Sequence, residues 1–144
     1  MLDELLAQQR QILALASELD TLTKAPVPAI TEVARIRWKS SNLLGEYLLA
    51  QDRLLHSLAA RGLGHVEQAI FETYFSELVG LRLSNADHTS RWDFETIKDD
   101  WKGYRKAARA QIDMLHDRAA WEEQFLFPVL RRLVSNDVNE RLAA

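Results

Sequence analysis

A chain of 144 residues with 47% hydrophobic and 27% charged residues has the length and composition of one folded domain. Its 18 basic and 21 acidic residues give a net charge of −3, which argues against the diffuse phosphate attraction on which nonspecific nucleic-acid binding depends. The chain contains no cysteine, so disulfides, thiolate metal sites and cysteine nucleophiles are excluded. We therefore expect a single domain over 1–144 with no nucleic-acid partner.

Two features of the sequence bear on location. The N-terminal residues include Asp3 and Glu4, where a secretory signal would carry basic residues. No apolar run approaches the roughly 20 residues that a membrane-spanning helix needs. We therefore expect a cytoplasmic protein that has no membrane partner.

Glycine and proline are scarce, at 5 and 3 residues, which favours helices over a β-sandwich or barrel with its frequent turns. In the first segment, 2–22, apolar residues recur at steps of three and four, and Gln9 takes one of the inward steps. Pro26 and Pro28 end this pattern, because proline lacks an N–H and disfavours helix in the residue before it. The sequence thus predicts an all-α protein that begins with an amphipathic helix.

The next stretch, 31–61, predicts a second and longer helix. Thr31 is a suitable N-cap, and Gly62 can adopt the left-handed backbone that ends many helices. The inward stripe of this helix is mainly apolar but includes Tyr47 and Gln51, which are four residues apart. Because residues at this spacing are neighbours on one helix face, we expect their side chains to reach each other.

A third helix is predicted from about His65 to Trp92, with an apolar and aromatic stripe along it. We expect a break within 93–98, where Asp93 or Thr96 can cap the following helix.

The fourth predicted helix presents an inward stripe from Trp101 to Leu133. Pro128 lies inside this stretch, so we expect a kink or an early end near Gln124. Four helices of comparable length with short connections predict an antiparallel up-down-up-down bundle around a shared core.

Polar residues also occupy inward steps near the middle of these helices, where burial without a partner would cost about 1–3 kcal/mol each. They are Gln9, Tyr47, Gln51, Arg118 and Glu122. An antiparallel bundle brings such positions to one level, so we predict a polar chamber in the core. Arg118 can reach Glu122 one turn away, although its spacing fits a surface position equally well.

The segment 121–130, with the sequence WEEQFLFPVL, resembles the end of the last helix in hemerythrin-like (HHE) domains, where a Glu-Glu pair precedes an apolar-Phe-Pro run. Segments 8–15, 51–53 and 77–82 are similar to the first, second and third helices of that family. The resemblance covers nearly the whole chain, and it depends on the order and spacing of these segments. It implies a hemerythrin-like four-helix bundle.

The same resemblance implies which residues stand at the positions of the family's non-haem di-iron ligands, which are four histidines and two glutamates. These positions are Gln9, Tyr47, Gln51, Leu78, Arg118 and Glu122. Only Glu122 keeps a ligand type that binds iron well. Arg118 would repel a divalent cation and neutralise Glu122, so the resemblance implies a bundle in which an internal cation replaces the metal.

Two alternatives give the protein a chemical function, either metal or oxygen binding or phosphotransfer. In the first, iron or oxygen binds through an altered ligand set that combines Glu122 with Glu123, Glu46 or a histidine. In the second, His56 acts in phosphotransfer, because its His-x-Leu sequence is similar to that of phosphotransfer four-helix bundles. The Lys-Gly expected next in that motif is replaced here by alanines at 59–60.

The sequence shows no glycine-rich phosphate loop and no nucleophile beside a base, so we expect no enzymatic activity. The leading hypothesis is a regulatory or interaction module that carries no cofactor and binds a protein partner or a small ligand. The space between the helices would suit an apolar or aromatic ligand. Either a monomer or a homodimer is compatible with these residues, and a di-iron cofactor remains the alternative.

Overall fold

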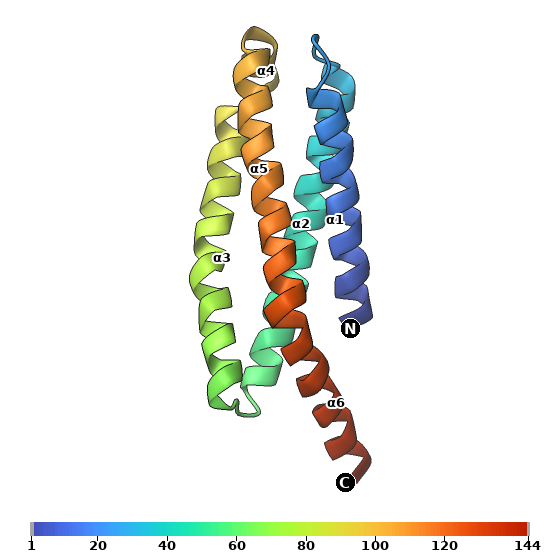
Figure 1. Cartoon of the computed structure of the whole chain (residues 1–144), viewed down its shortest axis with the longest axis vertical. Coiled ribbons are helices and arrows are strands. Elements are labelled where there is room, and N and C mark those ends of the chain that lie inside the picture. Colours follow the sequence, from blue (N-terminus) through green and yellow to red (C-terminus); the bar gives the residue numbers. More distant parts are fainter. Residues whose placement is uncertain (1, 144) are drawn as a thin grey trace.

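The computed structural model describes residues 2–143, in which every regular element is helical and there are no strands (Figure 1). The expectation of an all-α protein is therefore confirmed. The elements in chain order are α1, Leu2–Thr23; α2, Ile30–Ala59; α3, His65–Arg91; α4, Phe94–Asp99; α5, Trp101–Trp121; the π-helical turn η1, Glu122–Leu126; and α6, Phe127–Ala143.

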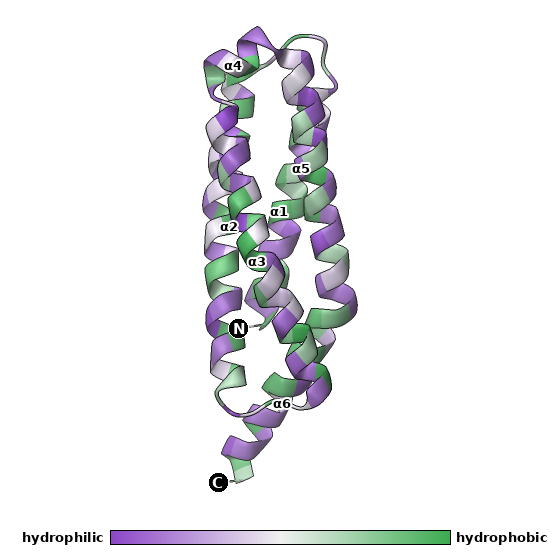
Figure 2. Ribbon diagram, turned by 90° about the vertical axis from the view of Figure 1, so that its left-hand side faces the viewer, coloured by the Kyte–Doolittle hydropathy of each residue, from purple (hydrophilic) through white to green (hydrophobic). Residues whose placement is uncertain are grey.

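The four long helices α1, α2, α3 and α5 lie lengthwise beside one another (Figure 1). The α1–α2 connection and α4 lie at one end of the molecule, and the α2–α3 connection lies at the other. Helix α6 extends past that second end, so the C-terminal part of the chain projects from the other helices (Figure 2). Hydrophobic and hydrophilic residues occur along every long helix, and none of the helices within 2–143 has the length and hydropathy needed to cross a bilayer.

The two ends of α2 differ in how well the sequence predicts them. Ala29 is the N-cap, and its carbonyl accepts a hydrogen bond from the amide of Val33 at 3.0 Å. The expectation that Thr31 caps this helix is wrong, because the helix begins one residue before it. At the other end, Gly62 has the predicted left-handed backbone, with a φ of 94°, and its amide donates to the carbonyl of Ala59 at 3.1 Å.

The break after α3 contains an additional short helix, α4. Of the two candidate caps, Asp93 is the one used, since its side chain accepts a hydrogen bond from the amide of Thr96 at 2.8 Å. A second aspartate, Asp100, caps α5 through the amide of Gly103 at 2.9 Å. The two caps are seven residues apart, one before each helix, so the predicted fourth helix begins at Trp101 after Asp100 and is capped by neither Asp93 nor Thr96.

The irregularity predicted near Gln124 is a π-helical turn. Pro128 has no N–H, so it cannot donate the usual helical hydrogen bond to the carbonyl four residues earlier. The turn η1 includes Gln124, the residue four before Pro128. At the C-terminal end of η1, the amide of Phe127 donates to the carbonyl of Glu122. A π-turn adds a residue to the helical repeat and occurs frequently at functional sites. The predicted fourth helix is therefore divided into α5, η1 and α6.

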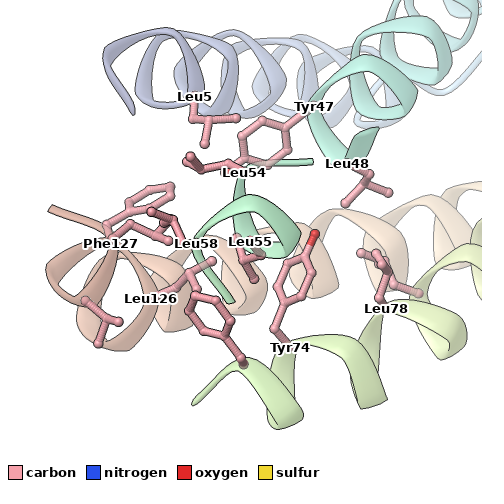
Figure 3. Close-up of a cluster of buried hydrophobic side chains, with 14 of the residues drawn as sticks. Leu5, Tyr47, Leu48, Leu54, Leu55, Leu58, Tyr74, Leu78, Leu126 and Phe127 are labelled. Carbon is pink, nitrogen blue, oxygen red and sulfur yellow. The ribbon is translucent and has the colours of Figure 1, made fainter. Parts of the chain in front are cut away.

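Buried hydrophobic side chains form two clusters. The larger one brings together α1, α2, α3, η1 and α6 and includes Leu55, Tyr74 and Phe127 (Figure 3). The smaller one lies near α4 and includes Val33 and Ile97. Burial of each large aliphatic or aromatic side chain contributes about 1.5–3 kcal/mol, so these clusters provide most of the attraction between the helices.

Replacement of Asp100 by alanine tests the second cap. The variant loses the hydrogen bond to the Gly103 amide, and we expect its free energy of unfolding to fall by about 1 kcal/mol, as at other N-caps. Denaturant unfolding followed by circular dichroism measures this change. Asp99→Ala is the matched control, because Asp99 is exposed and caps no helix; it should change the free energy by less than about 0.5 kcal/mol. Equal losses in the two variants would contradict the cap.

Candidate functional site

The carboxylate of Glu122 is the centre of a polar network inside the bundle. It is 1% exposed, although a carboxylate without partners costs several kcal/mol to bury. Its Oε1 accepts hydrogen bonds from the Tyr47 hydroxyl at 2.9 Å and from Gln9 Nε2 at 3.3 Å. Its Oε2 accepts a hydrogen bond from Gln51 Nε2. Donors from α1 and α2 thus replace the water that this carboxylate loses on folding.

Arg118 supplies the positive charge beside Glu122. Its side chain is 10% exposed, and its Nε lies 3.6 Å from Glu122 Oε2, a distance typical of an ion pair rather than a hydrogen bond. Its guanidinium carbon lies 4.9 Å from the centre of the Tyr74 ring and 5.3 Å from that of Trp121, within the range of cation–π attraction. A second ion pair joins Arg118 Nη1 to the exposed Glu77 at 3.6 Å. Of the two positions compatible with the spacing, Arg118 takes the interior one.

Further contacts set the orientation and the protonation of the side chains around Glu122. The Tyr74 hydroxyl donates to Gln51 Oε1 at 3.3 Å, which leaves the amide nitrogen of Gln51 directed at Glu122. Burial raises the pKa of Tyr47 above its ordinary value of 10.0, and the adjacent Glu122 charge raises it further. Burial also raises the pKa of Tyr74. Both phenols therefore keep their protons near neutral pH and act as hydrogen-bond donors.

Helix geometry explains why these residues meet. Tyr47 and Gln51 are four residues apart on α2, and Arg118 and Glu122 are four apart across the junction of α5 and η1. Gln9 lies on the buried side of α1 between Leu5 and Ile12. Figure 3 shows Tyr47 and Tyr74 in the cluster of buried side chains that adjoins this region.

The remaining residues singled out from the sequence do not join the network. Leu78 is buried in the larger hydrophobic cluster, where it offers no polar atom. Glu123 and Glu46 are exposed, so they do not converge with Glu122 as the altered ligand set requires. Within 2–143, no group of three or more histidine, aspartate and glutamate side chains is arranged to hold a metal ion.

His56, the candidate for phosphotransfer, lies on the surface of α2. Its side chain is 66% exposed, and its Nδ1 lies 2.8 Å from the carbonyl oxygen of Asp52 and 3.4 Å from Oδ1 of the same residue. The ring also packs 4.8 Å from that of Phe75. One ring nitrogen is thus occupied by the neighbouring turn.

Sequence reasoning missed two members of the network. One is Tyr74, which lies on the aromatic stripe of the third predicted helix; a buried tyrosine hydroxyl requires a partner, and this was the signal that could have identified it. Glu77 follows three residues later on the exposed side of α3, and nothing in its spacing distinguishes it from other surface glutamates.

The network is surrounded by apolar side chains and a small cavity of about 20 Å³. Apolar walls strengthen the electrostatic attraction inside and prevent water from competing for the carboxylate. No side chain in the network is an activated nucleophile, since the phenols are protonated and the amides are neutral. The arrangement holds the Glu122 charge in place, and of the Arg118 nitrogens Nε and Nη2 form no hydrogen bond within the described chain.

No known protein family, curated protein or solved structure matches this chain.

Truncation of Arg118 tests the charge compensation. Arg118→Ala leaves the buried Glu122 carboxylate without its cation, so we expect the free energy of unfolding to fall by about 3–5 kcal/mol. Denaturant unfolding provides the measurement. Arg53→Ala, at an exposed arginine on α2, is the control and should change the free energy by no more than about 0.5 kcal/mol.

A double-mutant cycle separates the charge pair from lost packing. In Arg118→Met combined with Glu122→Gln, both charges are removed while most of the side-chain volume stays. The loss should be smaller than the sum of the two single losses by about 0.5–3 kcal/mol. Strictly additive losses would mean that Arg118 and Glu122 do not stabilise each other.

Proposed function

We propose that this protein is a non-enzymatic binding module with a hemerythrin-like, up-down-up-down fold, in which a network of side chains takes the place of the di-iron centre. The observation that carries the proposal is the buried Glu122 carboxylate, which has three side-chain donors and one cation from within the chain. Its regulatory or interaction role would use the interior of the bundle or its surface to bind a small ligand or a protein.

The chemistry of the donor set argues against a di-iron centre at this position. Arg118 brings a fixed positive charge 3.6 Å from Glu122, the only carboxylate at the six ligand positions, and this charge would repel a divalent cation. Tyr47 would have to lose a proton whose pKa is strongly raised, and Gln9 and Gln51 provide only neutral amides. The residues present therefore do not fit the metal centre of the hemerythrin-like family.

A buried hydrogen-bond network can hold the helices of a binding module in fixed positions. Removing one partner of a buried polar group is costly, so helices that share such a network are held in one register. Here the network ties α1 and α2 to the α5–η1 junction. A fixed scaffold of this kind supports a binding surface or cavity elsewhere in the fold.

Iron content tests the proposal. After growth in iron-supplemented medium, we expect the purified wild-type chain to contain far less than one iron per chain and to lack near-ultraviolet oxo-iron absorption. Iron at close to stoichiometric levels in the wild-type chain would refute the proposal.

A variant that restores the family's ligand set tests the relation to hemerythrins. The substitutions are Gln9→His, Tyr47→His, Gln51→Glu, Leu78→His and Arg118→His, with Glu122 unchanged. If the helices share the register of that family, the folded variant should take up iron toward two atoms per chain and gain the oxo-iron bands. The same variant carrying Glu122→Ala is the control and should bind less. A variant that is helical by circular dichroism yet takes up no iron would contradict the hemerythrin-like register.

A further inference from the structure

A second interior space lies between the four long helices, beyond the network toward the end that carries α4. Its volume is about 80 Å³ and it is partly open to solvent. A cavity destabilises a protein in proportion to its volume, and most folded interiors are packed closely enough to avoid one of this size. A cavity of this size therefore needs an explanation in the physical properties of the residues that line it.

The walls of this cavity differ between its two ends. Arg37, His88 and Tyr104 line the end near α4. Further polar side chains also line the walls; they are Ser40, Ser41, Asn85, Thr89 and Gln111. The end near the network is apolar, and its walls also line the small cavity beside Glu122; they are Ile12, Leu44, Leu81 and Leu115. From Arg37 to Leu44 along α2 the distance is about 10 Å at the helical rise per residue. The cavity thus has the form and polarity of an elongated amphipathic molecule.

Tyr104 supplies the polar end with an unused hydrogen-bonding group. The residue is 0% exposed, and its hydroxyl oxygen has no hydrogen-bond partner within the described chain. Leaving a buried hydroxyl unpaired is unfavourable, and such groups are rare in folded proteins. Tyr104 lines the cavity, so an oxygen atom of a bound molecule can accept a hydrogen bond from this hydroxyl.

Arg37 sets the charge that the cavity prefers. It is the one wall residue with a permanent charge among those described, and no acidic side chain lines the cavity. Its guanidinium carbon lies 5.9 Å from the centre of the Tyr104 ring and 5.5 Å from that of Phe94. Its Nη2 donates to the carbonyl of Thr89 at 3.5 Å, which leaves its other N–H groups for the head group of a ligand. Burial, followed by the charge of Arg37, lowers the pKa of His88, which therefore remains a neutral hydrogen-bonding group at pH 7.

We propose that this cavity binds a small aliphatic carboxylate, with its carboxylate at Arg37 and Tyr104 and its alkyl chain directed toward Leu44 and Leu81. The inference names a ligand for the binding role proposed above and rests on that role, and it does not depend on a relation to hemerythrins. Shape and flexibility favour an aliphatic chain over an aromatic ring. The enclosed space of about 80 Å³ is smaller than a cavity of about 150 Å³ that holds benzene, so it takes only part of an alkyl chain, and the rest can extend through the opening to solvent.

Isothermal titration calorimetry with three ligands of equal chain length tests the head group. We expect sodium octanoate to bind saturably at one site per chain and to raise the melting temperature. Octan-1-ol should bind at least tenfold more weakly, because it lacks the charge that pairs with Arg37, and octylamine should not bind. Absence of saturable octanoate binding, or equal affinity for all three compounds, would overturn the proposal.

Two substitutions test the assigned residues. Tyr104→Phe should weaken octanoate binding about tenfold without lowering the melting temperature of the unliganded chain, because the hydroxyl has no partner to lose. Arg37→Gln should abolish the preference for octanoate over octan-1-ol. Arg91→Gln, at an exposed arginine on α3, is the control and should leave both affinities unchanged. Unaltered octanoate affinity in both cavity variants would contradict this binding mode.

The failure of this inference can be distinguished from failure of the proposed function. If the iron measurements hold and octanoate does not bind, only the ligand is wrong. If octanoate binds as expected while the wild-type chain carries stoichiometric iron, the proposed ligand site is supported and the proposal of a metal-free network is wrong.

Discussion

The burial of one carboxylate, that of Glu122, constrains how the helices of this protein fit together. Apolar stripes alone allow helices to slide or rotate with little penalty, because one leucine substitutes for another at the interface. A buried charge is different, since its partners must lie within hydrogen-bond distance and in the right direction. Tyr47 and Gln51 fix α2 relative to η1, Gln9 fixes α1, and Arg118 supplies the compensating charge from α5.

The network and the cavity divide the bundle interior into two parts with different properties. Around Glu122 both carboxylate oxygens accept hydrogen bonds, and the adjoining cavity measures only about 20 Å³. Toward α4, the space is four times larger and the Tyr104 hydroxyl has no partner. Satisfied polar groups favour rigidity, whereas unsatisfied groups beside free volume favour binding. The same four helices therefore provide both a fixed scaffold and a place for a ligand.

Periodicity allowed the long helices and the inward position of Gln9, Tyr47, Gln51 and Glu122 to be predicted, because polar residues at apolar steps stand out from their surroundings. Features that depend on which of several neighbouring residues is used were harder to predict. Several residues near the start of α2 and of α5 can cap a helix, and only the backbone path decides which one does. The interior position of Arg118 depends on contacts with α3 as well as with Glu122, and the spacing along α5 contains no information on these. The cavity arises from the packing of four helices together, so no single segment predicts it.

In this structure the Glu122 carboxylate is satisfied by side chains of the same chain and not by a metal ion. A crystal structure of protein from iron-supplemented cells, with diffraction data collected at the iron absorption edge, provides a test. We expect Gln9, Tyr47 and Gln51 within hydrogen-bond distance of Glu122, Arg118 beside it, and no anomalous peak in the core. An anomalous peak within bonding distance of Glu122, with those side chains turned away, would contradict it.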